Sequence, residues 1–146
     1  MFAKADAGDA VGEVFESNNT LYALMRVGPD FVIAALTVPG TASAGATITV
    51  TDTTRNIAAG TAPASTTRLY LSTNASLDAS DVPLASRAVP VLASGASDTA
   101  STSVTIPAGI AAGTYYLIAS ADADNAVGEL QEGNNTFART LQVTVP

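Results

Sequence analysis

The residues best placed to do chemistry are five oxygen-bearing side chains near the end of the chain: Asp122, Asp124, Asn125, Glu129 and Glu132. Proteins bind calcium through about six to eight oxygens from carboxylates, amides and backbone carbonyls. The cluster therefore predicts a calcium site whose ligands are Asp122, Asp124 and Glu129. The alternative is a solvated hairpin loop that binds nothing, because the spacing differs from the regular ligand loop of an EF-hand.

Most other chemistry is excluded by composition. The chain contains no histidine and no cysteine, which removes Ser-His and Cys-His nucleophile pairs and zinc sites made from those ligands. Glu129 and Glu132 form a carboxylate pair of the kind that hydrolyses glycosides, but no tryptophan and few other aromatic residues are present to bind a sugar. The chain is therefore predicted not to be an enzyme, with no catalytic residue and no cofactor other than calcium.

The charge balance limits the partners. Thirteen acidic and six basic side chains give a formal net charge of -7, and a phosphate backbone requires clustered lysine and arginine. No apolar run reaches the roughly 18 residues of a membrane-spanning helix. Nucleic acid and membrane insertion are thus not expected. The expected partners are adjacent copies of the same repeat or the same chain, together with a surface ligand that the sequence does not identify.

An internal repeat sets the organisation of the chain. Residues 2–27, FAKADAGDAVGEVFESNNTLYALMRV, align without a gap to residues 118–143, IASADADNAVGELQEGNNTFARTLQV, with 13 identities in 26 positions. Chance would give about one match in ten for this composition. The repeat divides the chain into a partial repeat, 1–28, and a complete one, 29–146. Residues 1–28 are then either the final strands of a preceding copy in a longer array or strands donated to a neighbouring molecule.

The repeat also bears on the calcium prediction. Gly8 stands where the second copy has Asp124, which favours the solvated loop. Asp6, Glu13 and Glu16 nevertheless match acidic residues of the second copy. A smaller site without Asp124 therefore remains open.

Short β-branched runs alternate with turn residues beyond Gly28, which is typical of an all-β sandwich. Ile48 and Val50 face one way between outward threonines, and Leu117 and Ala119 are expected to face Leu141 and Val143 in the core. Proline cannot donate to a strand ladder, so Pro83 and Pro90 place their strand at an edge. The predicted strands are residues 31–38, 46–55, 66–73, 82–91, 101–106, 114–123 and 137–145.

These strands predict an immunoglobulin- or fibronectin-III-like antiparallel β-sandwich of about seven strands. The extra two-strand segment that precedes it is homologous to its own last two strands. Tyr115, near the start of the penultimate strand, is expected to bond back to the preceding backbone or to pack as an ordinary aromatic. Asn134 and Asn135 are expected to hold the last long loop through side-chain hydrogen bonds.

Several motifs in order resemble the CARDB family, the cell-adhesion-related domain found in bacteria. They are ITVTDTTRN (48–56), TRLYLSTNASLDASDVPLASRAV (67–89), PAGIAAGTYYLIASADADN (107–125) and E-x-N-N-T (132–136). The resemblance covers residues 29–146, and residues 2–27 resemble the end of another copy. It implies an immunoglobulin-like or fibronectin-like sandwich, usually in tandem within secreted or surface proteins. The expected location is therefore extracellular or at the cell surface.

Three functions follow from the sequence. The first is a structural or adhesive module, a stalk or interaction domain of a tandem-repeat surface protein. The second is a self-assembling subunit of an extracellular filament or swapped oligomer, in which residues 1–28 donate strands through Val14, Leu21, Leu24 and Val27. The third is a carbohydrate-binding accessory module, which the scarcity of aromatic residues disfavours.

Overall fold

The computed structural model describes residues 1–23 and 27–145. A short hairpin comes first, made of β1 (Phe2–Lys4), the single 3₁₀ turn η1 (Glu16–Asn18) and β2 (Thr20–Tyr22). Eight further strands follow within the described residues: β3 (Phe31–Thr37), β4 (Thr41–Ser43), β5 (Thr47–Asn56), β6 (Ser65–Ser72), β7 (Val82–Val89), β8 (Ser97–Thr105), β9 (Gly113–Ser120) and β10 (Thr136–Thr144). In these residues no helix has the length and apolar character needed to cross a membrane.

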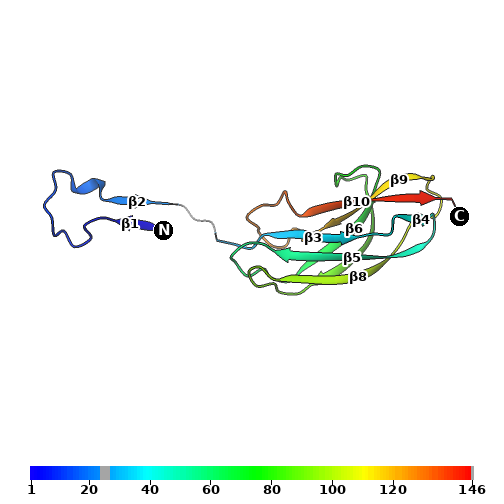
Figure 1. Ribbon diagram of the computed structural model, residues 1–146, viewed down its shortest axis with the longest axis horizontal. Helices are drawn as coiled ribbons and strands as arrows, with labels where there is room; N and C mark the ends of the chain where they lie inside the picture. Colours follow the sequence, from blue (N-terminus) through cyan, green and yellow to red (C-terminus); the bar gives the residue numbers. More distant parts are fainter. Residues whose placement is uncertain (24–26, 146) are drawn as a thin grey trace.

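Strands β3 to β10 form a sandwich of two sheets (Figure 1). One sheet has the order β4-β10-β9-β6-β7 and the other the order β3-β5-β8. The predicted all-β, immunoglobulin-like sandwich is therefore confirmed. Strand β7 is an edge strand of the larger sheet, as its prolines predicted, because an edge leaves one row of amides without ladder partners.

One strand differs from the prediction. Residues Thr41–Ser43 lie between two predicted strands and were not assigned to one, but they form β4, which pairs in parallel with Gln142–Thr144 of β10. The sandwich is therefore not wholly antiparallel. Three small residues carry no readable periodicity, so their strand character comes from the partner strand and not from local preference.

The core lies between the two sheets and is made of aliphatic side chains with Phe31. Each of these, when fully buried, stabilises the fold by about 1.5–3 kcal/mol. Leu117, Ala119, Leu141 and Val143 are all buried, as expected. They are not directly opposite one another, however, because Leu141 pairs with Tyr115 and Leu117 with Arg139.

The hairpin of residues 1–23 reproduces the backbone of β9 and β10. Its register, Phe2 opposite Tyr22 and Lys4 opposite Thr20, is the register that joins 118 to 138 and 120 to 136. The turns agree as well: left-handed residues with φ of 41° and 48° at positions 6 and 9 match 40° and 49° at positions 122 and 125. The sequence repeat is thus also a repeat of local structure.

The linker between the hairpin and the sandwich is fixed where it joins the sandwich. The Gly28 carbonyl accepts a hydrogen bond from the Gly60 amide (3.1 Å), and the Pro29 carbonyl accepts one from the Leu130 amide (3.0 Å). A Cβ at Gly60 would lie only 2.6 Å from the Gly28 carbonyl carbon. The hairpin lies beyond this end of the sandwich, and the C-terminus lies at the opposite end (Figure 1).

Candidate functional site

Polar side chains gather at the end of the sandwich where the linker joins it. We call the group formed by Asp30, Asp122, Glu129, Asn134 and Asn135 the linker-end cluster. Asp122 is 4% exposed and Asn135 is 8% exposed, while Glu129 and Asn134 are partly buried. The Asn134 side-chain amide donates to a carboxylate oxygen of the buried Asp30 (3.0 Å), which ties the last long loop to the start of β3.

The loop between β9 and β10 positions the cluster through local hydrogen bonds. Asp122 has a left-handed backbone, and its Oδ2 accepts a hydrogen bond from the Val127 amide (2.9 Å). The Glu132 carboxylate accepts one from the Glu129 amide (2.9 Å). Such side-chain to backbone bonds are the usual way in which aspartate and glutamate stabilise tight loops. They hold Asp122 and the backbone of Glu129 in place.

The cluster contains oxygens that these bonds do not use. Asp122 Oδ1, both carboxylate oxygens of Glu129, Asn134 Oδ1 and Asn135 Oδ1 are buried and accept no hydrogen bond of ordinary geometry. Leaving a buried polar atom without a partner costs about 1–3 kcal/mol. Buried atoms of this kind are usually satisfied by a bound water or an ion.

The pKa of Glu129 shows that burying its charge is also unfavourable. Burial raises its pKa from the ordinary 4.5 to about 7, although the nearby Asn135 side chain and Phe31 amide act to lower it. The negative charges of Glu132 and Asp122 raise it further. The cluster thus concentrates carboxylates in a place where water stabilises their charge poorly.

Asp124, predicted as the third calcium ligand, lies apart from the cluster. It is exposed, and it forms an ion pair of 2.7 Å with Arg68 of β6. Hydrogen bonds from Thr66 and Arg68 lower its pKa. The described residues contain no group of three acidic side chains placed to hold a metal, so the predicted triplet is not assembled.

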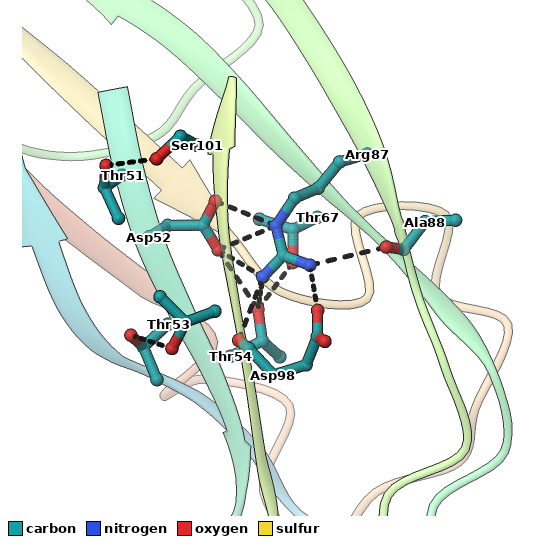
Figure 2. Close-up of polar contacts among 10 residues, drawn as sticks. Thr51, Asp52, Thr53, Thr54, Thr67, Arg87, Ala88, Asp98 and Ser101 are labelled. Carbon is teal, nitrogen blue, oxygen red and sulfur yellow. Dashed lines mark hydrogen bonds and ion pairs between the residues drawn. The ribbon is translucent and has the colours of Figure 1, made fainter. Parts of the chain in front are cut away.

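A second polar cluster lies between the sheets at their edge strands (Figure 2). Arg87 of β7 donates from Nε to Asp52 Oδ1 (2.9 Å) and from Nη2 to Asp52 Oδ2 (2.6 Å), and its Nη1 reaches Asp98 of β8. The Asp52 side chain is fully buried and that of Arg87 is 9% exposed. Thr54 and Thr67 share a hydrogen bond of 2.7 Å beside them.

This Arg87 cluster joins β7 of one sheet to β5 and β8 of the other. Burial lowers the pKa of Arg87, but hydrogen bonds and charge from Asp52 and Asp98 outweigh that and raise it. A guanidinium that donates to both oxygens of one carboxylate strongly fixes the positions of the two side chains. Removing either partner would leave the other as an unpaired buried charge. This cluster was not among the residues predicted from the sequence. Extending the alternation of Ile48 and Val50 to Asp52 would have placed this carboxylate inside the sandwich.

The remaining predicted residues are placed as follows. The Tyr115 hydroxyl donates to the Ala111 carbonyl (3.2 Å), a contact back to the preceding backbone. Val14, Leu21 and Val27 are exposed, together with Phe2 and Tyr22 of the same segment. Leu24 lies outside the described residues.

Comparisons with known proteins agree with this geometry. The CARDB family model matches residues 28–139, and no curated protein matches the chain. The CARDB domain of a Pyrococcus furiosus protein, solved in complex with di-metal ions, is 18% identical with a TM-score of 0.64, covering 84% of this chain and all of that one. A second similar structure is a domain of a Methanosarcina acetivorans protein whose name assigns it, by inference, to the cell surface. It is 23% identical with a TM-score of 0.59, and the match covers 81% of this chain and 94% of that one.

A different class of protein contains a similar domain as a small part. A β-glucosidase from Listeria innocua, solved with isofagomine, is 15% identical with a TM-score of 0.54. The match covers 79% of this chain but only 16% of the enzyme. At such identities the three structures show a shared fold and nothing about activity.

The two facing sheets and the core between them define an immunoglobulin-like β-sandwich. The family match extends over most of the sandwich. The chain belongs to the CARDB family, and this domain is a non-catalytic module.

Proposed function

We propose that the chain is a non-catalytic structural and adhesive module of an extracellular or cell-surface tandem-repeat protein, in which it serves as part of a stalk. The observation that carries this proposal is the hairpin of residues 1–23, which has the register and turn conformations of β9 and β10. In this proposal the hairpin is the end of one sandwich, and the residues after it form the next one. The surface assignment in the name of the Methanosarcina acetivorans protein supports the location.

The linker gives the array a defined geometry. Its carbonyls at Gly28 and Pro29 are bonded to loops of the following sandwich, and the close packing of Gly28 against Gly60 leaves little freedom there. Because the linker joins one end and the C-terminus leaves from the other (Figure 1), successive copies extend in one direction. Repeats that contact only their neighbours build long, thin structures of this kind.

The test is the solution size of joined copies. One, two and three copies of residues 28–143, linked head to tail, should give a maximum dimension by small-angle X-ray scattering that rises linearly with the number of copies. A flexible string would grow roughly as the square root of that number. Square-root growth would contradict the stalk.

A second function, strand donation, is favoured by a specific observation. Phe2 is 75% exposed, Leu21 78% and Val14 91%, and an isolated two-stranded hairpin has little stability in water. In this alternative, residues 1–28 complete a sandwich in a neighbouring chain and build a filament or a swapped oligomer.

Light-scattering chromatography distinguishes the two functions. The intact chain and a version starting at Gly28 are compared over a hundredfold range of concentration. Strand donation requires that only the intact chain forms larger species, and that their mass rises with concentration. Monomers in both samples would eliminate it.

A further inference from the structure

We propose that the linker-end cluster is a divalent-cation site suited to Ca²⁺, with Asp122, Glu129, Asn134 and Asn135 as its side-chain ligands. Asp122 Oδ1 and Asn135 Oδ1 belong to side chains that are more than nine-tenths buried, and neither atom has a hydrogen-bond partner. Asn134 contributes one more such oxygen, and the two buried carboxylate oxygens of Glu129 face the Asn135 side chain and the Phe31 amide without a hydrogen bond of ordinary geometry. Oxygens of carboxylates and amides, without nitrogen or sulfur, are the ligands that Ca²⁺ prefers.

The neighbours of these atoms place them in one region. The Asp122 carboxylate accepts the Val127 amide (2.9 Å), two residues before Glu129, and the Leu130 amide just after Glu129 donates to the Pro29 carbonyl (3.0 Å). The Asn135 carbonyl accepts a hydrogen bond from the Ala121 amide (2.8 Å), so the two ends of the loop are held together. Asn134 is fixed by its bond to Asp30. The side-chain nitrogen of Asn134 is thereby occupied, and its oxygen is left for a ligand.

No positive side chain balances the charge of the cluster in the part of the chain that the structure describes. Arg68, which comes from β6, is paired with Asp124 outside the cluster. Arg139 lies over the ring of Phe137, 4.7 Å from its centroid, and donates to the Leu36 carbonyl. The carboxylates of Asp122 and Glu129, when ionised, carry two negative charges, which balance the two positive charges of one divalent cation. Asp30 and Glu132 lie close by and attract it further.

The internal repeat supports the same four ligands. Asp6, Glu13, Asn18 and Asn19 stand at the positions of Asp122, Glu129, Asn134 and Asn135, while residues between them have changed, as at Gly8 and Ser17. The two copies thus share the residue types that carry the unpartnered oxygens in the second copy, and they differ at Asp124.

The site is complete only in the second copy. In the hairpin, Asp6 uses both carboxylate oxygens to accept the amides of Ala10 and Val11, at 3.0 and 2.9 Å. In the sandwich, Asp122 uses one oxygen in this way and keeps the other inside. Asp30, just before β3, and Phe31 at its start lie beside the site in the sandwich. We therefore expect one cation per chain.

A bound cation would stiffen the junction between repeats. It would hold the loop between β9 and β10, whose residues Asn134 and Leu130 contact Asp30 and Pro29 of the linker region. This consequence rests on the proposed stalk function, whereas binding itself does not.

The experiment uses the full chain, stripped with EDTA and dialysed, titrated with CaCl₂ by isothermal calorimetry. We expect one Ca²⁺ per chain, tighter than Mg²⁺ by at least tenfold, and amide NMR shifts confined to residues 28–31 and 119–137. Glu129→Gln should weaken binding at least tenfold. The matched variant Glu13→Gln, at the equivalent position of the hairpin, should leave affinity within twofold.

Three results would overturn the site: no heat and no spectral change at millimolar Ca²⁺, equal losses in the two variants, or shifts centred elsewhere. Circular dichroism of Glu129→Gln checks that the variant is folded, and Asn135→Ala gives a second variant with the same expected loss. Scattering from joined copies with and without Ca²⁺ tests the stiffening separately. Binding without a change in scattering would retain the site and overturn only its effect on the junction.

Discussion

The two related hairpins of this chain have the same backbone and opposite surroundings. Residue 118 is completely buried in β9, whereas Phe2 at the equivalent position of β1 is 75% exposed. Val127 is buried and its counterpart Val11 is exposed. The registers and the left-handed turn residues nevertheless agree. Local sequence therefore determines the shape of the hairpin, and the other strands of the sandwich determine whether it contributes to stability.

The largest effect should come from truncating one equivalent residue in each hairpin. Ile118→Ala removes a fully buried side chain and should lower the free energy of unfolding by about 2–5 kcal/mol. Phe2→Ala, in solvent, should change it by less than about 0.5 kcal/mol. Urea denaturation followed by circular dichroism measures both. Similar losses in the two variants would mean that the hairpin is packed against another molecule.

Much of the fold was predictable because alternation and proline placement are local signals. The edge position of β7 follows from Pro83, and the burial of Leu69 and Leu71 follows from their shared face. Strand β4 was not predictable, since its three small residues take their conformation from β10. The residues that lie opposite one another in β9 and β10 were also predicted wrongly, because the register of the two strands depends on the whole loop between them.

The candidate site was predictable only in part. The sequence places Asp122 and Glu129 in one loop, and the structure keeps them together. Asp124 is close in sequence, but it points to the outer surface of β6, where Arg68 binds it. Asn134 and Asn135 were expected only to hold the loop, since a sequence does not show which face of an amide remains without a partner.

A smaller effect is expected from changing the contact between the linker and the sandwich. Gly60→Ala would bring a Cβ to 2.6 Å from the Gly28 carbonyl carbon and should destabilise the sandwich by about 1–3 kcal/mol. Gly133→Ala is the control, because a Cβ there meets nothing within 4 Å and the first copy already has Ser17. Thermal melts of both variants test this. An unchanged melt for Gly60→Ala would show that the linker does not pack there.

The pH dependence of stability should differ between the equivalent glutamates. Glu129 has a folded-state pKa of about 7 against an ordinary 4.5, so the folded state holds more protons between these values. Stability in EDTA should therefore fall as pH rises from about 4.5 to 7 and stay low above it. Between pH 4.5 and 7, the fall in the free energy of unfolding should be smaller by about 1–2 kcal/mol in Glu129→Gln than in the unchanged chain. This value is reduced for solvent screening.

The control is Glu13→Gln, at the exposed equivalent position. It should leave the pH profile of the unfolding free energy unchanged within about 0.5 kcal/mol. A profile for Glu129→Gln that still falls between pH 4.5 and 7 would contradict the assignment of this dependence to Glu129.

The smallest effect should come from removing the first hairpin altogether. Its strands pair only with each other among the described residues. A chain starting at Gly28 should therefore melt within about 2 °C of the intact chain by differential scanning calorimetry. A loss of more than about 5 °C would show that the hairpin covers part of the sandwich in solution.

The short parallel strand β4 has a mechanical consequence. Strand β4 follows β3, which is the first strand after the linker, and its partner β10 leads to the C-terminus. Hydrogen bonds from the Gln142 amide to the Gly40 carbonyl and from the Ala44 amide to the Thr144 carbonyl join the two segments. When the two ends of the domain are pulled apart, parallel strands slide past each other, and these bonds share the load at once instead of opening one by one. In a surface protein exposed to flow, β4 would then set the force at which a repeat begins to unravel.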